Sequence, residues 1–515
     1  MSHLIVLPIV LPAIIAPFIL MVIRHHLDLQ RIFSVAGVLA LLTISLALTA
    51  QASSGDIQVY ELGDWPAPFG IVLVLDRLSA MMVLLTSVLA LAVVLYAIGS
   101  GWDARGRHFH ALFQFQLMGV AGAFLTGDAF NLFVFFEVLL IASYGLMIHG
   151  GGADRLRAGV QYVVYNLLGS TLFLFALGTI YAVTGTLNMA DLADRVAALS
   201  ADDTALIRVG AVLLLLVFAV KAAVLPLHFW LPGSYANAPA PVAALFGIMT
   251  KVGAYSILRM YTLVFGPNEP VSAGLVADWL LPAALLTLAI GMIGTLGARD
   301  VARMVAFAAI GSMGTLLVAI ALFTPLSAGA AIYYIVHSTL ATAMMFLVAD
   351  MIIERRGGAI ASAPRMPQSG LISALFFAGA IAMAGMPPLS GFLGKLMVLQ
   401  AATGMPQQTL IWAVILVTSL VAIMGFARAG SLIFWKTTSP EPAESNPIAE
   451  GEEILAIEAE PTVARLPFVA VFGLLVGLAA LTLFAEPAMS YAEATASQLF
   501  DPSGYKDAVL GRVAQ

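Results

Sequence analysis

The chain has 515 residues, of which 61% are hydrophobic and only 10% are charged. A soluble domain carries about 45–50% apolar and about 25% charged residues, so this composition excludes a water-facing surface and indicates a polytopic membrane protein. The net charge of -6 offers no footprint for a nucleic acid, and the lack of cysteine excludes disulfides, thiolate metal sites and cysteine nucleophiles.

Apolar runs near the roughly 20-residue length that a bilayer requires recur along the whole chain. The N-terminal run is too long for a signal-peptide core and lacks a charged front and a cleavage site, so it is the first predicted span. Further spans are predicted at 32–50, 73–98, 109–127, 129–148, 160–184, 206–231, 240–264, 276–297, 302–323, 328–352, 371–401, 409–434 and 465–485. We therefore expect an all-α integral membrane protein of about 14 transmembrane helices.

The basic residues are unevenly divided between the two sides of this predicted bundle. Alternate connections hold fourteen of the 23 basic residues: Arg24, Arg31, Arg105, Arg107, Arg155, Arg157, Arg299, Arg303, Arg355, Arg356, Arg365, Arg428, Lys436 and Arg465. Because cytoplasmic loops are enriched in Lys and Arg, both termini are predicted to face outward. Arg259 lies late in the eighth span, and we expect it to snorkel to the interface.

Residues 437–464 interrupt the apolar pattern with seven glutamates and several prolines. They predict an acidic cytoplasmic linker before the last span. A flexible spacer is one interpretation and a docking surface for a partner subunit is the other.

Three of the five lysines fall inside predicted spans, namely Lys221, Lys251 and Lys395. A charge at the bilayer centre costs at least about 2.5–3.5 kcal/mol, so such groups usually face a wet cavity or a partner. Lysine can gain and lose a proton on burial whereas arginine stays charged, which favours proton transfer. Glu137 and His337 lie at comparable depth on other spans.

Other interpretations of these residues remain open. Glu137 and Lys221 could form an ion pair that only joins two helices, although such pairs stabilise little after desolvation. His337 could be a core histidine that bonds to the backbone. Metal binding is disfavoured, since His228, His337 and Glu137 show no ligand spacing within one helix.

Two predicted spans are broken by proline and glycine. Pro226 and Pro232 interrupt the seventh span, and Pro387 and Pro388 interrupt the twelfth, each beside a deep lysine. Freed carbonyls in a bilayer must be satisfied by protein or water, so a break marks a hydrated cavity unless it is a packing kink. The odd offset of five helices predicts two inverted five-helix repeats, each containing a broken helix.

The predicted organisation has five parts. Residues 1–98 form the first three helices, 109–264 the first repeat and 276–434 the second repeat, followed by the linker 437–464 and by 465–515, a last helix with an external tail.

Several strings of this sequence are similar to those of one transporter family. DAFNLFVFFEVLLIASYGLMIHGG, TGTLNMADLA, VKAAVLPLHFWLPGSYANAPAPVAALFGIMTKVGAYSILR, YYIVHSTLATAMMFLVAD and AGMPPLSGFLGK together resemble the D subunit of Mrp-type (Pha, Mnh) multisubunit Na+/H+ antiporters. The resemblance spans roughly residues 70–435, and the family is related to the antiporter-like subunits of respiratory complex I. It implies a bacterial or archaeal plasma membrane and partner subunits of types A, B, C, E, F and G.

The resemblance also implies roles for individual residues. Glu137, Lys221, Lys251, His337 and Lys395 match the family's proton-transfer residues, while His228, Pro226 and Pro388 match an auxiliary relay and the helix breaks. Two positions depart from relatives. Gly233 stands where many have an acid, and Ala341 stands where some complex I subunits have lysine, which weakens a complex I assignment.

The expected function is therefore proton movement along a row of buried side chains, coupled to sodium transport across the assembled complex. The alternative is a proton-pumping membrane subunit of a complex I-type oxidoreductase. A membrane enzyme is disfavoured because GxSxG, HExxH and DDxxD motifs are missing from the sequence, so no catalytic residue, metal or cofactor is expected. A scaffold subunit is disfavoured by the intramembrane lysines.

Overall fold

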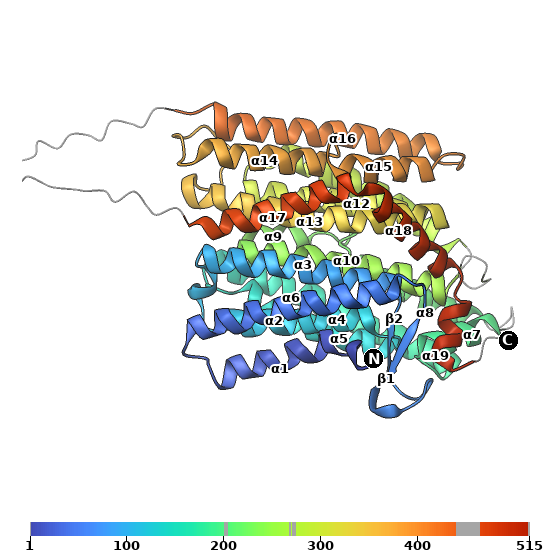
Figure 1. The fold of residues 1–515 in the computed structure, drawn as a ribbon. Coiled ribbons are helices and arrows are strands. Elements are labelled where there is room, and N and C mark those ends of the chain that lie inside the picture. Colours follow the sequence, from blue (N-terminus) through green and yellow to red (C-terminus); the bar gives the residue numbers. More distant parts are fainter. Residues whose placement is uncertain (1, 200–203, 267–268, 270–273, 439–463, 513–515) are drawn as a thin grey trace, which may run out of the picture.

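The computed structural model describes residues 2–199, 204–266, 269, 274–438 and 464–512. Figure 1 shows a bundle of long helices that lie side by side, with both ends of the chain at one end of the bundle. The predicted acidic linker 437–464 lies almost entirely outside the described residues.

Helices account for nearly all of the described chain. In the first half they are α1 (Leu7–Met21), α2 (Leu27–Ala52), α3 (Arg77–Gly99), α4 (Phe109–Leu125), α5 (Ala129–Met147), α6 (Ala153–Thr184), α7 (Met189–Ala197), α8 (Thr204–Lys221), α9 (Trp230–Asn237) and α10 (Ala240–Leu263). In the second half they are α11 (Leu281–Gly297), α12 (Val301–Ala321), α13 (Pro325–Arg356), α14 (Ser369–Ala384), α15 (Ser390–Ala401), α16 (Gln408–Gly430), α17 (Arg465–Leu483), α18 (Ala485–Phe500) and α19 (Ser503–Leu510). Short 3₁₀ turns (η1, Ser2–Leu4; η2, Leu62–Asp64; η3, Trp102–Arg105) and π-turns (η5, Val276–Leu280; η6, Ser431–Trp435) adjoin them.

Eleven helical segments of the described chain are long and apolar enough to cross a membrane, and α1, α4 and α14 are shorter apolar helices. Three of the eleven form the centre of the bundle: the most apolar window is 100% buried in α10 and 94% buried in α12 and α13. In α2, α16 and α17 the corresponding window is only 33% buried. The outer helices therefore expose apolar side chains, as lipid or another membrane subunit requires.

The predicted all-α class is confirmed, and a two-stranded hairpin precedes the third span. Strand β1 (Gln58–Glu61) pairs antiparallel with β2 (Val72–Leu75), so the third span begins at Arg77 and not at residue 73. The run VLVL is as apolar as a span, which hid its strand character. Asp76 then starts α3 through a capping box, because its side chain accepts from the Ser79 amide and the Ser79 hydroxyl accepts from the Asp76 amide.

Both predicted helix breaks are present. The chain leaves the helix after Lys221 and resumes at Trp230, and it leaves again after Ala384 and resumes at Ser390. Pro232 was predicted to interrupt a helix, and it does not. It lies in the first turn of α9, where an amide has no intrahelical acceptor and its loss is tolerated.

One further expectation needs correction. Arg259 does not snorkel: it is buried, and its guanidinium forms a two-pronged ion pair with Asp76 at 2.5 and 2.9 Å. The tail after residue 486 forms α18 and α19, which dock on the bundle. Gln498 accepts from the Arg77 amide at 3.1 Å, and Lys506 pairs with Asp194 at 3.1 Å.

Candidate functional site

Lys221 is the last residue of α8, and its side chain is buried between α8 and α6. Its ammonium donates to Asn166 Oδ1 at 3.1 Å and lies 5.8 Å from the centroid of the Phe136 ring. Gly169 on α6 faces this side chain, and a Cβ there would be in ordinary van der Waals contact with Lys221 Cε at 3.9 Å. Helix α8 therefore ends at a buried ammonium group, and the side-chain amide of Asn166 accepts a hydrogen bond from it.

Glu137 lies near the middle of α5 and is half-buried. Its Oε1 is buried without a hydrogen-bond partner among the described residues. It forms no ion pair with Lys221 within 4 Å in the described chain, yet it is near enough for its charge to act on Lys221 and on Tyr144. Glu137 and Lys221 are therefore not in direct contact, and Glu137 acts on Lys221 only through its charge. An unpartnered buried carboxylate oxygen needs water or a second chain.

Lys251 lies midway along α10, the most buried helix, and is 1% exposed. Within the described chain its ammonium donates no hydrogen bond to a protein acceptor. A buried polar group without a protein partner is normally satisfied by ordered water. The Lys251 ammonium therefore needs an acceptor that the described chain does not supply.

His337 is buried on α13 and is 1% exposed. Its Nδ1 is 2.9 Å from Ser390 Oγ at the start of α15, and the charges of both lysines act on the ring. Gly391 is required beside it, since a Cβ there would approach the His337 ring atoms to 2.9 Å. The second break thus brings its helix end against the histidine of α13.

Lys395 satisfies the second break directly. Its ammonium donates to the Ala384 carbonyl, the last of α14, at 2.8 Å and to Ser419 Oγ on α16 at 2.8 Å. The carbonyl freed by the break is therefore bonded by the lysine that the sequence placed beside it. Pro388 lies within this break.

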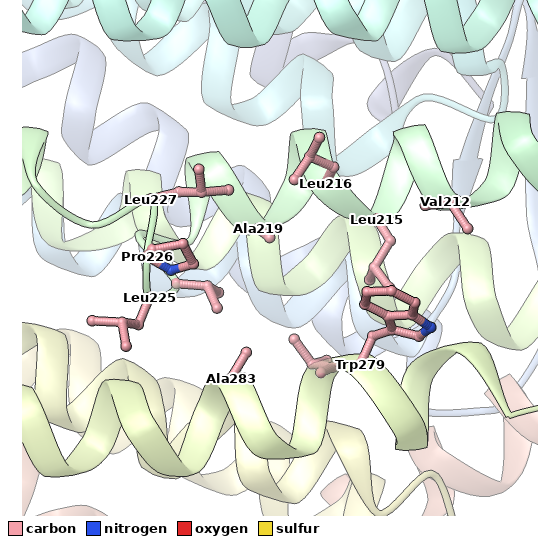
Figure 2. Close-up of a pocket in the computed structure, with 11 residues that line it drawn as sticks. Val212, Leu215, Leu216, Ala219, Leu225, Pro226, Leu227, Trp279 and Ala283 are labelled. Carbon is pink, nitrogen blue, oxygen red and sulfur yellow. The ribbon is translucent and has the colours of Figure 1, made fainter.

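At the first break, a side chain other than the lysine bonds to a freed backbone carbonyl. Trp230 Nε1 donates to the Val220 carbonyl at 3.1 Å, while His228 is buried in the break with its Nδ1 unpartnered among the described residues. Pro226 lines an apolar groove of about 230 Å³ between α8 and α11, together with Leu225 and Trp279 (Figure 2). The described residues that line this groove include no titratable side chain.

Sequence reasoning missed the polar partners of the lysines. Asn166, Ser390 and Ser419 are single polar residues inside apolar runs, and only their position on inward faces of α6, α15 and α16 distinguishes them from helix-surface polar residues. In the described residues no group of three or more His, Cys, Asp or Glu could hold a metal ion.

A second polar cluster lies at the end of the bundle opposite the termini, and we call this end of the bundle the basic end. Arg105, Arg155 and Glu354 line one cavity there. Asp103 in η3 accepts from Arg31 on α2 at 2.6 Å and is 3.2 Å from His110 Nε2 on α4. Burial alone would raise the pKa of the Asp103 carboxyl, but hydrogen bonds from His110 and Arg31 hold this pKa below its usual value.

Residues 126–422 match the family described as NADH:quinone oxidoreductase/Mrp antiporter, transmembrane. The chain is 39% identical over 518 residues to the D subunit of the Na(+)/H(+) antiporter of Bacillus subtilis, covering 99% of this chain and 100% of that one. It is 38% identical over 548 residues to the D subunit of a probable K(+)/H(+) antiporter of Rhizobium meliloti, covering 99% and 98%.

Solved structures agree. A chain of the Mrp complex from Dietzia sp. superposes with a TM-score of 0.87 at 29% identity, covering 99% of this chain and 100% of that one. A chain of respiratory complex I from Thermus thermophilus gives 0.76 at 24% identity over 96% and 99%, which shows a shared fold. The chain therefore belongs to the NADH:quinone oxidoreductase/Mrp antiporter family, and within it to the D subunits of Mrp-type antiporters.

Proposed function

We propose that this chain is the proton-translocating D subunit of a multisubunit Na+/H+ antiporter, acting with subunits of types A, B, C, E, F and G in a bacterial or archaeal plasma membrane. The supporting observation is that four titratable side chains are buried in the bundle, namely Lys221, Lys251, His337 and Lys395. Two of them meet the second helix break, where His337 Nδ1 is 2.9 Å from Ser390 Oγ and the Lys395 ammonium is 2.8 Å from the Ala384 carbonyl. Protons would pass along Glu137, Lys221, Lys251, His337 and Lys395, with His228 as an auxiliary relay.

The proposed mechanism is a transfer of charge state between neighbours. A proton gained or lost by one group changes the electrostatic energy of the next, so each step sets the proton affinity of its neighbour. Water joins groups that no protein atom bridges, in particular Lys251. Both broken helices would allow small adjustments beside Lys221 and Lys395.

The proposed topology has fourteen spans, which requires the shorter helices α1, α4 and α14 with α15 to cross the membrane as well. The broken helices α8–α9 and α14–α15 would be equivalent members of two inverted repeats. The basic end would face the cytoplasm, with both termini outside, as the distribution of arginine favours.

Replacing Lys221 with alanine tests the function. In everted vesicles that contain the whole complex, Lys221→Ala and Glu137→Ala should abolish sodium-driven proton exchange while the complex still assembles. Lys436→Ala, which removes an exposed lysine, is the matched control and should leave exchange intact. Exchange at the unmodified rate in the Lys221 variant would contradict the proposal.

A complex I-type subunit is the second candidate, since the family and the fold include such proteins. The identity of 38–39% to antiporter subunits over the whole chain favours the antiporter. Purification of the native complex separates the two: flavin and iron–sulfur chains that copurify would support the oxidoreductase, and their absence the antiporter.

A further inference from the structure

A polar cavity of about 390 Å³ lies at the basic end, between α6, α9, α10 and α13. Its polar and charged lining includes Trp102, Arg105, Arg155, Asp350 and Glu354. A single water needs about 10–15 Å³ of such space, so the cavity has room for many waters. None of these residues belongs to the proton path described above.

Asp350 is the deepest acid in this cavity and is 4% exposed. Its Oδ2 accepts from Trp102 Nε1 and from the Tyr96 hydroxyl, both at 2.9 Å. Because both bonds reach the same oxygen, Oδ1 is left for water or a proton. The carboxylate is thus held in place by two donors and still borders a wet space.

The charges around Asp350 favour a proton over a metal cation. Arg105 stacks on Trp102 at 3.7 Å from the ring centroid and pairs with Glu354 at 3.4 Å, while Arg155 donates to the carbonyl of Asn237 at 2.9 Å. Two guanidinium groups therefore balance two carboxylates. A sodium ion in this space would meet both guanidiniums, whereas a proton arrives through water and needs one carboxylate oxygen.

The cavity also reaches towards the path. Ala243 lines it, and Lys251 lies eight residues further along α10, about 12 Å at the helical rise. Along α13 the distance from Asp350 to His337 is thirteen residues, or about 20 Å. The cavity wall at Ala243 is thus nearer to Lys251 than Asp350 is to His337.

We propose that this cavity is the passage for protons between the basic end and the proton path, with the Asp350 carboxylate exchanging a proton between water in the cavity and water on the side of Lys251. No bond between heavy atoms changes in this step: the proton binds Oδ1 and leaves it. The inference rests on the proposed proton-translocating function. Its tests are chosen so that the inference can fail while the proposed function stands.

The first test is Asp350→Asn in the assembled complex. The amide oxygen still accepts from Trp102 and Tyr96, but the side chain no longer binds a transferable proton, so exchange in vesicles should fall at least tenfold. If Asp350 only holds the helices together, Asp350→Asn will exchange at the unmodified rate and Asp350→Ala will not. That result, with Lys221→Ala still inactive, would overturn the inference and leave the proposed function standing.

The second test decides the question even where Asp350→Asn does not assemble. The chain has no cysteine, so a single introduced cysteine can be followed by mass spectrometry. Ala243 and Ala254 are both buried on α10, at 1% and 0% exposure, but of the two only Ala243 lines the cavity. Ala243→Cys in the active complex should therefore react with a membrane-impermeant thiol reagent added at the basic end, whereas Ala254→Cys should not. An unreactive Cys at position 243 would overturn the inference, because the cavity would then be closed to water.

Discussion

The three buried ammonium groups are satisfied in three different ways. Lys395 has a carbonyl and a hydroxyl acceptor, Lys221 has one amide acceptor, and Lys251 has none in the described chain. A charged group that leaves water needs hydrogen bonds to compensate its desolvation. The dependence on water should therefore rise from Lys395 to Lys221 to Lys251.

The single acceptor of Lys221 gives a prediction at this scale. Asn166→Leu removes it and leaves the buried ammonium unpaired, at a cost of about 1.5–3 kcal/mol for a bond to a charged group. Since about 1.4 kcal/mol corresponds to a factor of ten, sodium-driven exchange should slow at least tenfold. Asn166→Asp, which keeps an acceptor, should retain more exchange than Asn166→Leu, and the reverse order would contradict this role.

At the scale of elements, one ion pair and a hydrogen bond beside it join four parts of the fold near the terminal end of the bundle. Asp76 caps α3, Arg259 belongs to α10, and the Tyr505 ring from α19 lies 5.3 Å from the Arg259 guanidinium carbon. The Tyr491 hydroxyl of α18 donates to the Arg77 carbonyl at 2.8 Å. The C-terminal helices are thus fixed to the bundle through the start of α3.

Removing one member of this pair should destabilise the protein strongly. Asp76→Ala leaves Arg259 buried and unpaired, and breaking a buried pair in this way costs about 3–5 kcal/mol. Thermal unfolding of the purified protein should show a lower Tm, and the double variant Asp76→Ala/Arg259→Leu should recover part of the loss. A double variant less stable than Asp76→Ala would contradict this account.

The same pair predicts a pH dependence of stability. Burial alone would raise the pKa of Asp76, but Arg259 holds this pKa below its usual value, so the ionised carboxylate stabilises the folded state. This contribution is present above the unfolded pKa, at about pH 4, and is lost as the pH falls further. As the pH falls below about 4, the Tm should decrease. The decrease should be less steep in the Asp76→Ala/Arg259→Leu variant.

At the scale of the whole molecule, hydropathy and proline placement predicted the helical bundle and both helix breaks. They could not predict the hairpin, because VLVL is apolar in a strand and in a span alike, nor the partner of Arg259, because Asp76 is 183 positions away in sequence. The deep lysines were visible as rare charges in apolar runs. Their acceptors were not, since Asn166 and Ser419 become distinctive only once the helices pack.

A density map of the assembled complex that resolves ordered water tests the proton path most directly. The account predicts a chain of waters that joins Glu137, Lys221, Lys251, His337 and Lys395 through the centre of the bundle, with water against the Lys251 ammonium. Apolar side chains packed between these groups, with no water at Lys251, would contradict it.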